Sequence, residues 1–263
     1  MCSVSIEPSV FKIDDGAIEI VGSRLDGPDG QWEQFWPILS PQERARADRF
    51  VHDLHRRRFI VARGRLRQLL AHRLGDSPAM IGISAADGKP KLCERWARSG
   101  LRFNVSHSDE LAVYAFARGR EVGVDVELIS DIPQEEALVA RFYSPTERAA
   151  LTALPCEQRK IAFFAWWTRK EAFLKALGCG LGYPLTNFSV TVDPDGPARI
   201  TQINGSEAEA QVWAMASFRL SAAYIGAVAY QTKGDSPPEA RFPASDTTQV
   251  ALGSVGAAAA SSG

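Results

Sequence analysis

Two acidic residues alternate with valines in the segment Gly123-Val-Asp-Val-Glu127. In an extended strand, side chains two positions apart point to the same face, so Asp125 and Glu127 share one face. Neighbouring carboxylates repel one another unless they are solvated or share a cation. A hard cation such as Mg²⁺, bound by a few carboxylates and a substrate phosphate, would resolve that repulsion. Without a metal, the alternative is an edge strand with one face exposed to solvent, where water would solvate both carboxylates.

A second pair of charged residues lies in the aromatic-rich segment Trp167-Thr-Arg-Lys-Glu-Ala-Phe-Leu-Lys175. Glu171 and Lys175 are four positions apart, so a helix places them on one side. The carboxylate could bind a metal or accept a proton, and the ammonium could hold a phosphate. A solvated surface salt bridge is the ordinary alternative. The neighbouring aromatic residues indicate that most of this helix is covered, which favours a partly buried pair.

Basic residues are concentrated ahead of these two motifs. Nine arginines lie between positions 44 and 67, namely Arg44, Arg46, Arg49, Arg56, Arg57, Arg58, Arg63, Arg65 and Arg67. Their guanidinium groups suit forked contacts to phosphate oxygens, although many of them could be ordinary solvated helix charge. Lys89, in the turn Gly88-Lys-Pro90, could join them. His107 follows a strand-like run and is either a structural residue or a hydrogen-bond donor to phosphate.

The elements that must position these residues alternate between helix and strand. Ser40-Pro-Gln-Glu43 and Ser144-Pro-Thr-Glu147 each combine a serine cap, a proline in the first turn and a glutamate three residues after the cap. Long helical regions follow both, and strand-like runs rich in β-branched and aromatic residues follow the helices. This order predicts an α+β fold.

The two helix starts also predict an internal duplication. Ser40 and Ser144 lie 104 positions apart, and the segments 59–67 and 163–171 are related by the same offset. Chance is the alternative, because capping signals are common, but the order of the following elements agrees as well. We therefore expect two similar α+β halves at 1–120 and 121–232, with a ligand cleft between them. The Pro/Ser/Gly/Ala-rich tail at 233–263 is expected to be disordered.

Composition sets the remaining expectations. The chain has 263 residues, 45% of them hydrophobic, and its net charge of −1 gives no general attraction to nucleic acid or an anionic membrane. Four scattered cysteines, Cys2, Cys93, Cys156 and Cys179, lack zinc-ligand spacing and suit a reducing compartment. No secretory signal pattern and no run of ~20 apolar residues is present. These features predict a cytoplasmic protein without nucleic-acid or membrane partners.

Taken in order, the motifs resemble the 4′-phosphopantetheinyl transferase superfamily, of the larger, surfactin-synthetase-activating (Sfp-like) type. The strand motif at 122–127 is followed, after some forty residues, by the helix motif at 167–175. Upstream, the segments 88–90 and 104–108 match the preceding motifs of the family, and the segment 40–50 resembles its N-terminal basic segment. The similarity covers roughly residues 36–230.

The resemblance implies a reaction and roles for the acidic residues. Coenzyme A would bind between two similar halves, and Mg²⁺ would bridge its pyrophosphate and Asp125, Glu127 and Glu171. A serine of an apo carrier protein (acyl, polyketide or peptidyl) would attack the β-phosphate, take up the phosphopantetheine arm and release 3′,5′-ADP. Glu171 is the favoured general base, with Glu127 the alternative, and Lys175 would hold the phosphates.

The resemblance also implies that Arg46, Arg58, Lys89, Ser106 and His107 bind the phosphates of the coenzyme, including the 3′-phosphate. Some relatives carry lysines where this chain has Glu43 and Arg46. Two other functions stay open on the residues alone: a Mg²⁺-dependent phosphohydrolase with water as nucleophile, and a non-catalytic anion-binding protein. A duplicated chain supplies both sides of the cleft, so we expect a monomer.

Overall fold

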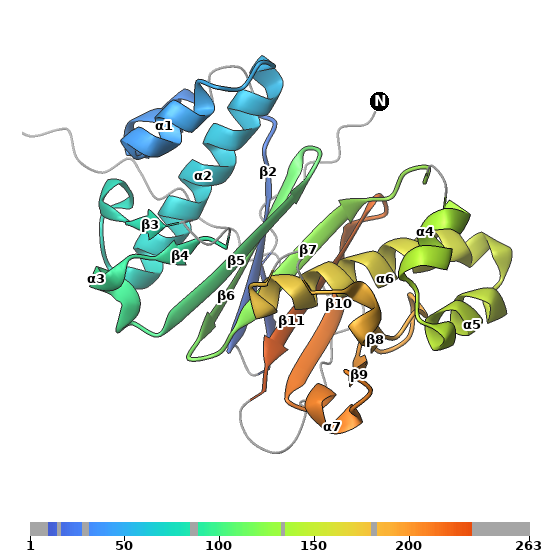
Figure 1. Cartoon of the computed structure of the whole chain (residues 1–263). Coiled ribbons are helices and arrows are strands. Elements are labelled where there is room, and N and C mark those ends of the chain that lie inside the picture. Colours follow the sequence, from blue (N-terminus) through green and yellow to red (C-terminus); the bar gives the residue numbers. More distant parts are fainter. Residues whose placement is uncertain are drawn as a thin grey trace, which may run out of the picture.

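The computed structural model describes residues 10–14, 17–27, 32–84, 89–132, 135–179 and 183–232, and the predicted disordered tail at 233–263 lies outside them. Helices and strands alternate along the chain as predicted (Figure 1), so the α+β prediction is confirmed. Within the described residues, no helix combines the length and apolar character needed to cross a membrane.

The first half of the described chain forms a four-stranded antiparallel sheet. Its elements are β1 (Val10–Ile13), β2 (Ile18–Arg24), the 3₁₀ helix η1 (Glu33–Ile38), α1 (Pro41–Ala47), α2 (Asp53–Leu74), the 3₁₀ helix η2 (Pro78–Met80), β3 (Ile83–Ser84), β4 (Lys91–Leu92), α3 (Glu94–Ala97), β5 (Leu101–Ser108) and β6 (Leu111–Arg118). The strand order is β1-β2-β6-β5, and β3 pairs with β4 separately.

The second half forms a three-stranded antiparallel sheet. Its elements are β7 (Val122–Leu128), α4 (Glu135–Phe142), α5 (Pro145–Ala153), α6 (Cys156–Leu177), the 3₁₀ helix η4 (Leu185–Asn187), β8 (Phe188–Val190), β9 (Ile200–Ile203), α7 (Glu207–Ala210), β10 (Trp213–Ser221) and β11 (Tyr224–Gln231). The strand order is β10-β11-β7, and β8 pairs with β9 separately.

Strand β6 shows how the layers are arranged. Its successive side chains alternate between two cores: Tyr114 and Phe116 pack with residues of α2, whereas Val113 and Ala115 pack with residues of β7, β10 and β11. Alternation of this kind is the normal period of a strand, and here both faces are buried. The two sheets therefore face one another, and α2 and α6 cover their outer faces (Figure 1).

The two halves repeat the same order of elements. Helices α2 and α6 both have 22 residues, and both end at a left-handed glycine, Gly75 at φ 66° and Gly178 at φ 74°. Both follow a short helix that begins with a complete capping box. The sheet order β2-β6-β5 in the first half corresponds to β7-β11-β10 in the second. The predicted duplication is therefore visible in the structure, while the exact domain boundaries stay a prediction.

One detail of the predicted alignment is wrong. The long helices begin and end 103 positions apart, not 104, because the connection from the capping serine to the long helix is one residue shorter in the second half. The segments 59–67 and 163–171 are therefore out of register by one residue. In the corrected register Arg67 corresponds to Lys170.

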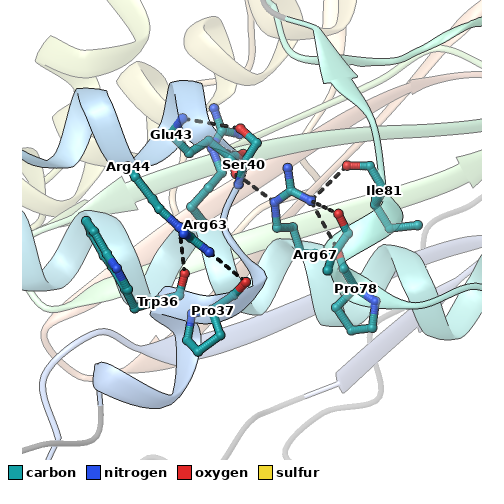
Figure 2. A network of polar contacts seen from close by, with 10 residues as sticks. Trp36, Pro37, Ser40, Glu43, Arg44, Arg63, Arg67, Pro78 and Ile81 are labelled. Carbon is teal, nitrogen blue, oxygen red and sulfur yellow. Dashed lines mark hydrogen bonds and ion pairs between the residues drawn. The ribbon is translucent and has the colours of Figure 1, made fainter.

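The capping-box glutamate of the first half has a structural role (Figure 2). Glu43 accepts a hydrogen bond from the Ser40 backbone N–H at 2.8 Å and pairs with Arg67 Nε at 2.7 Å. The Arg67 side chain, which is 2% exposed, also donates to the carbonyls of Pro78 and Ile81. The pair joins the start of α1, the middle of α2 and the segment after α2. The negative charge of Glu43 thus belongs to the core of this half.

The second half contains the equivalent pair. Glu147 accepts from the backbone N–H groups of Ser144 and Val190, both at 2.8 Å, and pairs with Lys170 Nζ at 2.9 Å. Lys170, whose side chain is fully buried, also donates to the carbonyls of Leu185 and Phe188. Since a buried charge is tolerated only when it is paired and hydrogen-bonded, each half uses the same solution to anchor its long helix.

Candidate active site

The close approach of α6 to β7 depends on Gly123. A Cβ atom at this position would lie 2.2 Å from the Ala172 carbonyl oxygen and 2.2 Å from the Ala176 backbone nitrogen. Only a residue without a side chain fits at these distances. The glycine in the strand motif therefore allows the helix to lie directly over β7, which brings Glu171 and Lys175 next to Asp125.

Strand β5 contributes three polar side chains to the same place. Asn104, Ser106 and Ser108 occupy alternate positions and face β7 across the junction of the two sheets. The Asn104 Oδ1 atom accepts from the Val124 backbone N–H at 3.0 Å. Ser106 Oγ donates to Asp125 Oδ1 at 2.7 Å, and Ser108 Oγ donates to Glu127 Oε2 at 2.8 Å. The two halves are thus joined at the site by pairs of polar groups.

Lys175 completes the central contact. Its Nζ atom lies 2.6 Å from Asp125 Oδ1 and 2.9 Å from Ser106 Oγ. The Asp125 side chain is 4% exposed and that of Lys175 is 29% exposed. Groups from β5, β7 and α6 therefore converge at one point, with Asp125 at the bottom and the ammonium nearer to solvent.

The three carboxylates of the site influence one another. Burial raises the pKa of Asp125, although Lys175 and Ser106 oppose the shift. Burial and the charge of Asp125 raise the pKa of Glu127 and of Glu171. Each raised pKa means that the ionised form costs free energy in this place. The site has an excess of negative charge that Lys175 neutralises only in part.

Two oxygens of this cluster could bind a cation. Asp125 Oδ2 and Glu171 Oε1 are buried and have no hydrogen-bond partner among the described residues. The structure gathers no group of three His, Cys, Asp or Glu side chains arranged as a metal site within its described residues. Mg²⁺, however, commonly takes one or two protein carboxylates and completes its shell with water and substrate phosphate. The unpartnered oxygens fit that kind of binding.

The predicted phosphate ligands lie in different surroundings. His107 is exposed on β5 and alternates with Ser106, so the two side chains point to opposite faces. The Arg46 guanidinium lies over the Phe59 ring, 5.2 Å from its centroid. None of these contacts tests whether His107 or Arg46 binds a phosphate, so both assignments stay predictions.

Arg58 and Lys89 are held by protein groups. Arg58 makes a forked contact to Asp26 at 2.8 and 2.7 Å and a further contact to Asp109 at 2.7 Å. The hydrogen bond to Asp26 is the main reason why the pKa of Arg58 is raised above its usual range. The Lys89 ammonium lies against Glu121 at the start of the second half, with 3.1 Å between Nζ and Oε2. The structure does not bring Lys89 into the Asp125–Lys175 cluster.

Sequence reasoning did not identify Asn104 and Ser108 as part of the site. Their signal was present: in the segment 104–108, polar residues occupy every second position of a strand, which places them on one face. What the sequence lacked was the partner, because β5 and β7 belong to different sheets and meet only in the folded chain.

Two family models match different parts of the chain. Residues 121–229 match the family model described as 4′-phosphopantetheinyl transferase superfamily, and residues 27–118 match the model described as 4′-phosphopantetheinyl transferase, N-terminal. The chain is 41% identical over 177 residues to the 4′-phosphopantetheinyl transferase HetI of a Nostoc species, covering 67% of this chain and 74% of that protein.

Two other relatives are more distant. The 4′-phosphopantetheinyl transferase Sfp of Bacillus subtilis is 30% identical over 186 residues, which cover 70% of this chain and 80% of that protein. A mouse protein, L-aminoadipate-semialdehyde dehydrogenase-phosphopantetheinyl transferase, is 26% identical over 173 residues, 62% of this chain and 56% of its own length. The two regions matched by the family models together contain the motifs that converge on Asp125.

Proposed function

The chain belongs to the 4′-phosphopantetheinyl transferase superfamily, whose members activate carrier proteins, and from this premise we propose the reaction that its site performs. The enzyme transfers the 4′-phosphopantetheine arm of coenzyme A to a serine of an apo carrier protein and releases 3′,5′-ADP. The observation that carries the proposal is the convergence of Ser106, Asp125 and Lys175, with Glu171 beside them, at the junction of the two halves.

Lys175 is proposed to hold the phosphates during transfer. An ammonium group has three donors, and Asp125 and Ser106 take two of them, which leaves one N–H for a phosphate oxygen. Phosphoryl transfer spreads negative charge over the equatorial oxygens, so a fixed cation stabilises the transition state. The remaining phosphate groups are proposed to be bound by Ser106, His107 and Arg46. Arg58 would join them once its partners Asp26 and Asp109 release it.

Asp125, Glu171 and Glu127 are the residues that would hold Mg²⁺. The unpartnered oxygens of Asp125 and Glu171 and the raised pKa values of all three carboxylates support this assignment. When bound, the cation would supply positive charge against the charge that develops on the pyrophosphate of the substrate.

Glu171 is proposed to be the general base. A serine hydroxyl is a weak nucleophile and requires a base within reach. The raised pKa of Glu171 makes its carboxylate a stronger base than an exposed one. Since Oε1 is proposed to bind the cation, the other carboxylate oxygen would take the serine proton. Glu127 already accepts a hydrogen bond from Ser108, which favours Glu171 over Glu127 for this role.

Mass spectrometry tests the proposal directly. The protein is mixed with coenzyme A, Mg²⁺ and a panel of apo acyl, peptidyl and polyketide carrier domains. Attachment of a phosphopantetheine arm to a carrier serine, lost when Mg²⁺ is removed by a chelator, supports the transferase. Hydrolysis of coenzyme A without attachment would support a phosphohydrolase, and no reaction with any carrier would support a non-catalytic protein.

We also propose that the enzyme is a cytoplasmic monomer without a nucleic-acid partner. Residues of a single chain supply both sides of the site, which supports a monomer. Cys93, Cys156 and Cys179 are free thiols, which supports a reducing compartment. The net charge of −1 supports the absence of nucleic acid from its partners. Light scattering on the purified protein measures the oligomeric state.

A further inference from the structure

Lys89 reaches from the first half of the chain into the second. Its Nζ atom lies 3.1 Å from Glu121 Oε2, 3.3 Å from the Val122 carbonyl oxygen and 3.1 Å from the Ala176 carbonyl oxygen. The Lys89 side chain is only 11% exposed. Glu121 is held in turn by Arg102 of β5, with 3.1 Å between Nε and Oε1. One ammonium group therefore contacts the start of β7 and the end of α6 together.

The number of donors on this side chain is decisive. An ammonium group has three N–H donors and no acceptor, and Lys89 has three oxygen acceptors within hydrogen-bond distance. No donor remains for a phosphate oxygen while these contacts persist. Lys175 differs in this respect, because two of its donors are used and it is more exposed.

The contacts of Lys89 also suit the helix end to which they are made. The last carbonyls of a helix have no partner within the helix, and a cation near that end is favoured by the helix dipole. The Ala176 carbonyl is one of these groups, since α6 ends at Leu177. Gly178 lies at the same helix end, and a Cβ atom there would be in ordinary contact with Lys89 Cδ, at 3.4 Å.

The two segments that Lys89 joins are the ones that carry the reaction centre. Ala176 is the residue after Lys175, and Val122 is three residues before Asp125. Between them, Gly123 lies against the backbone of Ala172 and Ala176. A contact that fixes the end of α6 and the start of β7 against the first half therefore fixes Lys175 and Asp125 relative to Ser106.

We propose that Lys89 is a positioning residue that locks α6 and β7 of the second half against the first half, and that it is not a ligand of coenzyme A phosphates. This inference rests on the proposed transferase activity. It assigns Lys89 a role different from the one that the family resemblance implied for the Gly88–Pro90 motif. Glu121 is its partner in that role.

Steady-state kinetics of Lys89→Met separates the two roles. If Lys89 is a positioning residue, the kcat of Lys89→Met should fall tenfold or more, because misplacement of reacting groups by about 1 Å can lower the rate on the order of 10²-fold. The KM for coenzyme A should change less than twofold. Calorimetric binding of coenzyme A and of 3′-dephospho-coenzyme A should keep the wild-type ratio of dissociation constants. Glu121→Gln should reproduce the kcat defect, and the double variant should be little worse than either single one.

Two further variants sharpen the result. Arg102→Gln removes the other cation that contacts Glu121, at an exposed position, and serves as the matched control with less than twofold change in kcat. Lys89→Arg keeps the charge, but a planar guanidinium cannot point its donors in the three directions that Lys89 uses. We expect Lys89→Arg to stay defective in kcat, whereas a phosphate ligand would be restored by it.

The opposite outcome would overturn the inference: a rise of tenfold or more in the KM and dissociation constant for coenzyme A, loss of discrimination against the 3′-dephospho form, and rescue by arginine. Unchanged kinetics in Lys89→Met would overturn it as well. If Lys89→Met does not fold, as judged by circular dichroism, Glu121→Gln alone carries the test. Failure of the wild-type protein to modify any carrier would reject the proposed function itself, while the binding measurements still report whether Lys89 contacts the coenzyme.

Discussion

Replacing Gly123 by alanine should displace α6 from β7 and impair transfer. The added Cβ would meet the backbone of Ala172 and Ala176 at 2.2 Å, and a helix backbone cannot rotate away as a side chain can. An ordinary contact begins at 3.4 Å, so the helix must move by about 1.2 Å. If that movement lies along the Lys175–Asp125 contact, the distance of 2.6 Å lengthens to about 3.8 Å, which is too long for a hydrogen bond.

The expected magnitudes follow from this displacement. Misplacement of reacting groups by about 1 Å lowers rates on the order of 10²-fold, so kcat should fall by about that factor. Overpacking of a core costs about 1–3 kcal/mol. For a chain of this size, each kcal/mol corresponds to about 2–4 °C in Tm, so the melting temperature should fall by roughly 2–12 °C.

The assay combines transfer to an apo carrier, followed by mass spectrometry, with thermal unfolding followed by circular dichroism. Gly22→Ala is the matched control, because it also lies in a strand, but its Cβ would meet only the flexible side chain of Leu220 at 3.0 Å. That variant should keep a kcat within twofold of wild type. Wild-type kcat and Tm in Gly123→Ala would refute the reasoning, since the strand and helix would then tolerate a methyl group between them.

Four further predictions concern the charged groups. Glu171→Gln should lower kcat by about 10²–10⁴-fold with an unchanged circular dichroism spectrum, as loss of a general base does; near-normal turnover would remove it from that role. Lys175→Ala should lower kcat by about 10²–10³-fold through lost charge stabilisation, and an unchanged rate would place it outside the site. Lys170→Met should destabilise the fold by about 3–5 kcal/mol, measured by denaturant unfolding, because Glu147 is left charged and buried; the companion change of both residues to apolar ones should recover part of the loss. Glu127→Gln should raise the Tm of the ligand-free protein at pH 8, because a carboxylate with a raised pKa costs stability when ionised. That advantage should shrink as the pH falls through the pKa of Glu127 and vanish when the carboxylate is protonated in both states, so a pH-independent difference would contradict the electrostatic cause.

Local signals in the sequence predicted the local structure well. The capping boxes at Ser40 and Ser144 form as expected, because all the groups that make them lie within four residues. The stop of α6 at Gly178 has a local cause as well, because glycine adopts the left-handed conformation found there. The one-residue error in the alignment of the helices arose between these signals, where the length of a connection has no local cause and only tertiary packing reveals it.

Tertiary partners were the part that the sequence could not provide. Glu43 was interpreted as a departure from lysine in the phosphate-binding segment, whereas it is buried against Arg67. The contacts of Lys89 with Glu121 and with two carbonyl oxygens were likewise not predicted. In each case the charge was visible in the sequence, but its partner lies more than twenty residues away, and no periodicity connects the two.

The register of the two sheets shows which residues of the first half stand at the positions that Asp125 and Glu127 occupy in the second. In the first sheet Val21 pairs with Tyr114 and Ser23 with Ala112. In the second sheet Asp125 pairs with Ala227 and Glu127 with Ile225. Adding 104 to the residue numbers of β2 gives the equivalent positions in β7, and adding 113 to those of β6 gives the equivalent positions in β11. With these offsets the two sets of paired residues superimpose. Val21 and Ser23 therefore occupy the positions of the two carboxylates in the first half.

The long helices agree with this correspondence. At their offset of 103, Gln68 and His72 of α2 stand where Glu171 and Lys175 stand in α6. Two identical halves would form two equal reaction centres, one at each junction. In this chain the positions of the first half that correspond to Asp125, Glu127 and Glu171 carry Val21, Ser23 and Gln68 instead of carboxylates. The chain therefore has one reaction centre, in its second half, and the equivalent positions of the first half lack the charged groups. The protein should bind coenzyme A with a calorimetric stoichiometry of one per chain.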